Sequence, residues 1–153
     1  MRALEFLGRA SVIKKQINTT MRKIDLLRAM TQRVTSSMDA EVVSRTRDVT
    51  SNETAIIKLI EAKDRLAALQ NEYAVIVEET MAMLNQIEDE YGEAILSLKY
   101  LQGKQRKEIC DELHLGHTQV HDHHEKAVAE LEILLQKSGQ FRTEPDSSGQ
   151  FRT

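Results

Sequence analysis

The sequence has few of the residues that interrupt helices or cross-link a chain. Its 153 residues include one proline (Pro145), one cysteine (Cys110), six glycines and no tryptophan, and only 4% of them are aromatic. A single cysteine excludes a disulfide within the chain. Because proline breaks helices, the long stretch before Pro145, rich in Ala, Leu, Glu, Lys and Arg, is typical of an all-α protein.

Membrane-spanning and secretory segments are also missing. No apolar run reaches the roughly 18 residues that a membrane helix needs. The first residues, MRALEFLGRASVIKK, are interrupted by Glu5, Gly8 and Arg9, so we do not expect a signal peptide. We therefore expect a cytoplasmic protein that does not bind a membrane.

The residue patterns of common enzymes are absent as well. We find no glycine-rich phosphate loop, no serine or cysteine nucleophile with a placed base, and no paired carboxylates in a strand or loop frame. His117 and His121 have the four-residue spacing that can hold zinc on a helix, but no second segment of ligands accompanies them. We predict that the protein is no enzyme and binds no cofactor and no metal.

Apolar residues repeat at alternating spacings of three and four in the first 90 residues, which is typical of a coiled-coil seam. The first run is Ala10, Ile13, Ile17, Thr20, Ile24, Leu27, Thr31 and Val34, and the second is Leu59, Ala62, Leu66, Leu69, Tyr73, Ile76, Thr80, Met83 and Ile87. A polar segment, TSSMDAEVVSRTRDVTSNET, separates them, and we expect Ser51 or Asn52 to cap the second helix. Residues 1–90 are therefore predicted to form a long antiparallel helical pair.

Charge is divided unevenly over this pair. Residues 1–33 carry a formal net charge of +6, and residues 34–91 carry −7. Pairing of two antiparallel helices is one use of that opposition, and contact of the first helix with a DNA backbone is another. We expect the coiled coil to make a homodimer, with an intramolecular hairpin and a monomeric module as the alternative.

The segment from Ile95 to Leu131 is the most informative: ILSLKYLQGKQRKEICDELHLGHTQVHDHHEKAVAEL. Two short apolar stripes, the first ending before Gly103 and the second before His114-Leu115-Gly116, precede a longer third stripe. Residues 91–137 therefore predict three helices in the layout of a helix-turn-helix. We expect its core to hold Ile109, Leu113, Val120 and Ala127, with Cys110 as a buried thiol.

The string Tyr100, Gly103, Glu108-Ile109, Leu113, Val120, Ala127 and Leu131 resembles the fourth region of bacterial sigma factors. With the helical pair ahead of it, the chain is similar to phage and prophage regulators of the ArpU and RinA-like family. The sigma-like resemblance covers roughly residues 93–135, and the broader one roughly residues 12–136. The resemblance implies a sequence-specific DNA-binding transcription regulator of phage type, acting in the cytoplasm of a host bacterium on double-stranded DNA, with host RNA polymerase as a further partner.

The third helix of a helix-turn-helix enters the major groove, and the second crosses the DNA backbone. We therefore predict that bases are contacted from the start and the outward side of the third helix, by His117, Thr118, Gln119, His121 and Asp122. We predict backbone contacts by the cations that begin the second helix, Lys104, Arg106 and Lys107. Of the remaining histidines, His124 is expected to be partly buried and His123 exposed.

Acidic residues leave a second function open. Residues 92–137 contain six Lys and Arg against eight Asp and Glu, a formal net charge of −2, and Asp122 and Glu125 stand where similar modules carry cations. DNA affinity depends on cations that meet phosphates. The alternative is a protein-interaction module that binds RNA polymerase or another partner and keeps weak DNA affinity.

The last residues contain a perfect repeat. SGQFRT at 138–143 recurs at 148–153, and its Ser, Gly, Pro and Asp content argues against packing. We predict a disordered tail over residues 138–153. A short recognition tag anchored by Phe141 and Phe151 is the alternative.

Overall fold

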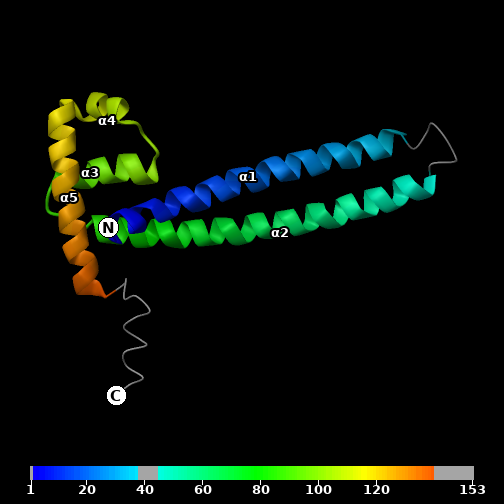
Figure 1. The fold of residues 1–153 in the computed structure, drawn as a ribbon, viewed down its shortest axis with the longest axis horizontal. Coiled ribbons are helices and arrows are strands. Elements are labelled where there is room, and N and C mark those ends of the chain that lie inside the picture. Colours follow the sequence, from blue (N-terminus) through cyan, green and yellow to red (C-terminus); the bar gives the residue numbers. More distant parts are fainter. Residues whose placement is uncertain (1, 38–44, 140–153) are drawn as a thin grey trace, which may run out of the picture. The chain divides into compact units, whose positions relative to one another are not determined.

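The computed structural model describes residues 2–37 and 45–139, and every regular element in these two ranges is a helix (Figure 1). The elements in chain order are α1 (Arg2–Ser37), α2 (Arg45–Leu84), α3 (Glu90–Leu96), the π-helical turn η2 (Ser97–Leu101), α4 (Arg106–Leu113) and α5 (His117–Ser138). The all-α prediction is confirmed. None of the helices in the described ranges has both the length and the apolar character needed to cross a membrane.

The predicted heptad positions lie on the inner side of the long helix pair. Each of those with a described side chain is buried or half-buried, from Ala10 to Thr31 in α1 and from Leu59 to Met83 in α2. The start of α2 differs from the prediction, because the helix begins at Arg45 and includes Ser51 and Asn52. Extending a helix through such residues costs less than about 1 kcal/mol each relative to alanine, so weak helix formers do not end one that is already formed.

Contacts divide the chain into two compact units. One unit consists of residues 12–74, where Ile24, Leu27 and Ala62 are buried together and Leu59 and Leu66 pack beside them. The other joins the first eleven residues to everything from Val75 onward. Its boundaries lie inside α1 and α2, whereas the sequence pattern predicted a division at residue 90. The expected tail falls largely outside the described residues, since Ser138 ends α5 and Gly139 caps it.

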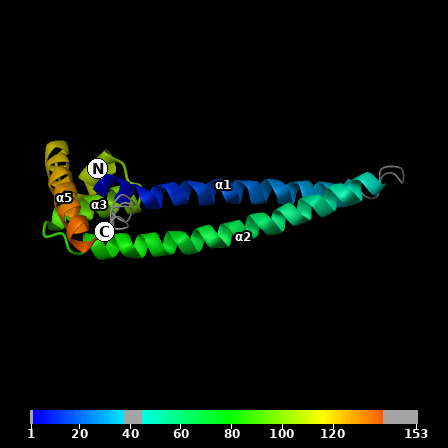
Figure 2. The ribbon, with the colours of Figure 1, turned by 60° about the horizontal axis from the view of Figure 1, so that its bottom comes forward.

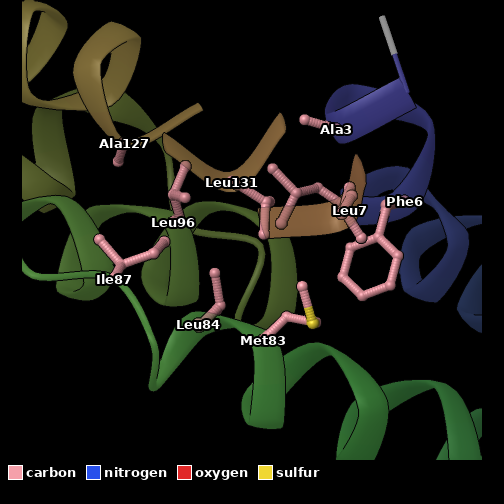
Figure 3. Packing of buried hydrophobic residues seen from close by; sticks show 10 residues of the cluster. Ala3, Phe6, Leu7, Met83, Leu84, Ile87, Leu96, Ala127 and Leu131 are labelled. Atoms are coloured by element: carbon pink, nitrogen blue, oxygen red, sulfur yellow. The ribbon is translucent and has the colours of Figure 1, made fainter. Parts of the chain in front are cut away.

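The largest core belongs to this second unit and combines both ends of the described chain (Figure 2). It contains Ala3, Phe6 and Leu7 of α1, Met83 and Leu84 of α2, Ile87 of the following connector, Leu96 of α3, and Ala127, Leu131 and Leu135 of α5. Figure 3 shows these side chains converging from α1, α2, α3, α5 and the connector that follows α2. Each fully buried Leu, Ile, Phe or Met side chain among them contributes about 1.5–3 kcal/mol. The start of α1 is therefore part of the core that holds α5.

Two carboxylates of α5 add polar contacts around this core. The backbone N–H of Ala3 donates to Oε2 of Glu132 at 2.9 Å, and the backbone N–H of Glu88 donates to Oε1 of Glu130 at 2.8 Å. The first four N–H groups of a helix have no partner within the helix, so Glu132 satisfies one at the start of α1. That hydrogen bond holds the pKa of the Glu132 carboxyl below its ordinary value.

The beginning of α3 is tied to α5 by Asp89 and His123. Asp89 caps α3 by accepting the backbone N–H of Tyr91 at 3.1 Å, and its other oxygen lies 2.7 Å from Nδ1 of His123. The prediction that His123 is exposed was wrong, because its ring is half-buried and packs 5.2 Å from the Tyr91 ring. The hydrogen bond with His123 lowers the pKa of the Asp89 carboxyl below its ordinary value.

Close approach of α3 to α5 depends on Gly92. A Cβ atom added to Gly92 would stand 2.7 Å from Cβ of Ala127, far inside the contact distance of two carbon atoms. Each Cβ atom is fixed by its own backbone, so the clash can be relieved only if α3 and α5 move apart. The two helices therefore meet through a glycine and an alanine.

We expect Gly92→Ala to destabilise the protein by about 1–2 kcal/mol, since overpacking costs about 1–3 kcal/mol and alanine recovers up to about 1 kcal/mol of helix propensity. Chemical denaturation measures the change. Gly8→Ala is the matched control, because nothing lies within 4 Å of the added methyl group, and it should be neutral or stabilising. Gly92→Ala with Ala127→Gly should be less destabilised than the sum of the two single variants. Strict additivity would contradict the close approach.

Replacement of Asp89 should separate its capping role from its charge. Asparagine caps as well as aspartate, so Asp89→Ala should cost about 1 kcal/mol and Asp89→Asn less. Folding lowers the pKa of Asp89, so its charge stabilises the folded state. This stabilisation is complete above the unfolded-state pKa of about 4 and is lost as the pH falls through the folded-state pKa. Unfolding free energies of the wild type and Asp89→Asn, measured from neutral to acidic pH, should therefore converge at low pH. A constant difference would count against the charge contribution.

Candidate nucleic-acid interface

The α4–α5 pair is held by a small core of its own. Ile109 and Cys110 of α4 and Val120 of α5 are buried against Ile95 of α3 and Leu98 of η2, with Leu113 and Leu115 at the edge. Three of the four expected core residues are found here. The fourth, Ala127, was predicted to lie in this core, but it belongs to the larger cluster around α1 and α2. One helix therefore supplies residues to two cores.

The connection between α4 and α5 is a tight turn around His114. His114 caps α4 with φ 57° and ψ 41°, in the left-handed region, where nearly all non-glycine residues are unfavourable. The carbonyl of Cys110 accepts the backbone N–H groups of both His114 and Leu115, the latter at 3.1 Å. Gly103, before which the first predicted stripe ends, also lies in the left-handed region, with φ 70°.

Helix α5 begins at His117, directly after the predicted break at His114-Leu115-Gly116, and Gly116 is its N-cap. Glycine has no side chain to satisfy the free N–H groups of the first turn. The contact runs the other way, because the N–H of Gly116 itself donates to Oε1 of Gln119 at 3.0 Å. In the same manner the N–H of Gln105, before α4, donates to Oε2 of Glu108 at 3.2 Å. Gln119 therefore has a structural role at the start of α5.

The five residues predicted to contact bases, His117, Thr118, Gln119, His121 and Asp122, are all exposed. They occupy the first turn of α5 and its outward side, while Val120, Ala127, Leu131 and Leu135 bury the inward side. Two exposed acids, Asp122 and Glu125, lie among or next to them. The start of α5 thus presents a polar surface of mixed charge.

The three predicted backbone-contacting cations, Lys104, Arg106 and Lys107, are exposed as well. The backbone N–H of Lys104 donates to the carbonyl of Leu98 at 2.9 Å, which ties the segment after Gly103 to η2. Arg106 and Lys107 form the first turn of α4. A hollow of about 30 Å³ next to Arg106 is lined by Ile95, Lys99, Ile109, Val120 and His124.

Lys99 and Tyr100 lie beside the predicted site, although the sequence pattern gave neither a functional role. Lys99 is exposed and lines the same hollow as Arg106, whereas Tyr100 is half-buried. The hydroxyl of Tyr100 lies 2.9 Å from Nε2 of His124, and the two rings stack with centroids 5.8 Å apart. The π-helical turn η2 shifts the register of this segment, so a regular helical pattern could not assign these side chains to a face.

His124 is partly buried, as predicted. Burial lowers its pKa, and the nearby charge of Lys99 lowers it further. Burial also raises the pKa of the Tyr100 hydroxyl, with a smaller contribution from the charge of Glu125. The neutral forms of both side chains are therefore favoured, which suits a packing contact between η2 and α5.

Metal chemistry finds no support in the geometry. Among residues 2–37 and 45–139, no group of three or more His, Cys, Asp and Glu side chains is arranged to hold a metal ion. Sγ of Cys110 lies 3.7 Å from Nδ1 of His117, but no arrangement of three ligands is completed around His117 and His121 within these ranges. The exposed histidines are available for hydrogen bonding.

Residues 33–132 match a family described as "Protein of unknown function (DUF1492)". The chain belongs to this family. The match begins near the end of α1, spans all of α2, α3, η2 and α4, and ends within α5. The DUF1492 region therefore includes the whole α4–α5 connection and the exposed start of α5. No curated protein and no solved structure matches the chain.

The left-handed turn residue allows a stability test. A non-glycine residue in this conformation is strained by roughly 1–2 kcal/mol. Glycine avoids this strain, but part of the gain is lost because glycine has greater conformational freedom in the unfolded chain. We expect His114→Gly to stabilise the protein by up to about 1 kcal/mol in thermal or chemical unfolding. His121→Gly, at an exposed position inside α5, is the control and should destabilise it by about 1 kcal/mol. A destabilising His114→Gly would show that this turn is not left-handed.

Proposed function

We propose that this protein is a sequence-specific DNA-binding transcription regulator in which α4 and α5 form a helix-turn-helix. The observation that carries the proposal is the division of α5 into two sides. The inward side of α5 is buried in two cores. In its first two turns His117, Thr118, His121 and Asp122 remain exposed, next to the tight turn in which His114 is left-handed. That is the arrangement in which the second helix of such a pair enters the major groove.

Side-chain chemistry supports a division of labour between the two helices. Thr118 can contact a thymine methyl group, and Asp122 can accept from cytosine N4. Oε1 of Gln119 accepts from Gly116, so its Nε2 is the group that can donate to N7 of adenine. Lys104, Arg106 and Lys107 are exposed at the N-terminal end of α4, where a helix that crosses the DNA backbone meets phosphates. We propose base contacts from α5 and phosphate contacts from α4.

The rest of the proposal concerns context. The resemblance to phage and prophage regulators suggests a phage-type protein that acts in the cytoplasm of a host bacterium and contacts host RNA polymerase. One helix-turn-helix contacts few base pairs, so we further propose a homodimer that spans two half-sites about one DNA turn apart. The heptad residues with described side chains are already buried or half-buried within one chain, so a second copy would pack on apolar residues that the long helices leave exposed, such as Leu26, Ile57 and Ile60.

A protein-interaction module is the second candidate, and one observation favours it. Asp122 and Glu125 are exposed on or beside the side of α5 that would face DNA, and residues 92–137 have a formal net charge of −2. A surface with this balance attracts phosphates weakly. In this alternative the start of α5 binds RNA polymerase or another protein.

The decisive experiment selects bound duplexes from a randomised DNA pool and then measures affinity for the enriched duplex at several salt concentrations. We expect enrichment of a defined sequence. Changing Lys104, Arg106 and Lys107 together to Ala should weaken binding and reduce the slope of log K against log salt by up to about 3, because each cation neutralises about one phosphate.

Three exposed cations of α1, Lys14, Arg22 and Lys23, provide the matched control. Their replacement by Ala removes the same charge and should leave the slope unchanged. A larger loss of affinity in this variant than in the α4 variant would place the DNA contact on the first long helix, and equal losses would mean that both sets of cations contribute alike. Equal binding to all duplexes, or none at all, would favour the protein-interaction module.

A further inference from the structure

The buried thiol of α4 contacts the first residue of α5. Sγ of Cys110 lies 3.7 Å from Nδ1 of His117, and Cys110 is only 8% exposed. The carbonyl of the same cysteine accepts the N–H groups of His114 and Leu115, which shape the turn. Cys110 therefore touches both the connection between the helices and the side chain that follows it.

In a neutral histidine ring, the hydrogen bond made by one nitrogen determines whether the other nitrogen carries the proton. A thiol is a weak donor and a weaker acceptor, whereas an unprotonated imidazole nitrogen is a good acceptor. The favourable pairing places the thiol hydrogen on Cys110 and the lone pair on Nδ1 of His117. The ring proton then lies on Nε2, which makes the exposed end of the ring a donor.

We propose that Cys110 is a positioning residue for His117: its thiol donates to Nδ1 and holds the ring so that Nε2–H points outward as a hydrogen-bond donor. Such a donor complements an acceptor and rejects a donor. In the major groove cytosine presents only the N4 donor and is rejected, and of the remaining acceptors we assign N7 of a purine, rather than O4 of thymine, to His117. The choice of purine rests on the proposed DNA-binding function, and the thiol–imidazole contact does not.

The first test uses the full chain labelled with ¹⁵N-histidine at about pH 8, where an unperturbed imidazole is neutral. Two-bond proton–nitrogen spectra identify the protonated nitrogen of each ring. We expect His117 to carry its proton on Nε2 alone, with an Nδ1 shift distinct from that of His121, the exposed control one turn later. Cys110→Ala should move the His117 shifts to those of His121, and Cys110→Ser, which keeps a donor, should preserve them. A proton on Nδ1 in the wild type, or unchanged shifts in Cys110→Ala, would overturn the proposal.

The second test uses the duplex enriched from the randomised pool, with each purine replaced in turn by its 7-deaza analogue, which lacks the N7 acceptor. Wild type and Cys110→Ser should lose about five-fold in affinity at one purine, as expected for a single neutral hydrogen bond. His117→Ala and Cys110→Ala should lose nothing further at that purine, and thermal unfolding checks that both remain folded. A Cys110→Ala protein as sensitive as the wild type would overturn the positioning role. If no duplex is enriched, the proposed function fails, and the spectra alone decide whether the thiol holds the ring.

Discussion

The burial of one side of α5 is the constraint on which the second unit depends. Val120 packs with α3 and α4, whereas Ala127, Leu131 and Leu135 pack with the start of α1 and the end of α2. A single helix of 22 residues thus joins two cores, and its rotation about its own axis is fixed at both ends. Because the inward side is fixed, the outward side of the first two turns is fixed as well. The orientation of every proposed contact residue follows from apolar packing that lies up to five turns away.

Stability is unevenly distributed between the two units. Among the described side chains of residues 12–74, six apolar ones are buried, namely Ile13, Ile24, Leu27, Ala55, Ala62 and Leu69, whereas the largest core of the other unit alone contains ten. At about 1.5–3 kcal/mol for each large apolar side chain, this difference outweighs any surface ion pair, which contributes about 0–1 kcal/mol. Leu26, Ile57 and Ile60 of residues 12–74 are more than half exposed. Local opening is therefore expected to begin in this stretch of the long helices, and the unit that carries α4 and α5 should open last.

The periodicity of the sequence predicted the helices better than the contacts between helices that are distant in sequence. The heptad residues of α1 and α2, the left-handed Gly103 and the start of α5 after Gly116 all follow from spacing and from turn chemistry that acts within a few residues. The role of Gly92 could not be predicted, because it depends on Ala127, which is distant in sequence. The contact between His123 and Asp89 could not be predicted either, because these residues are 34 positions apart in the sequence. Ala3 and Phe6 continue the spacing of the first heptad run backward, so a signal for the start of α1 was present, although Leu7 stands outside this spacing. Exposure of the five candidate base-contacting residues followed from the helical pattern, but exposure alone does not identify what they bind.

The hydrogen bond between Ala3 and Glu132 spans 129 positions of the chain. A protein made only of helices ordinarily has mostly local contacts and folds quickly. Here the two long helices and the α4 turn can form early. The core that fixes α5 can form only after residues of α1, at the start of the chain, have met residues of α5. During synthesis, Phe6 and Leu7 emerge from the ribosome long before Leu131 can cover them. These side chains are a place where the nascent chain can be held by a chaperone or can aggregate before the fold closes.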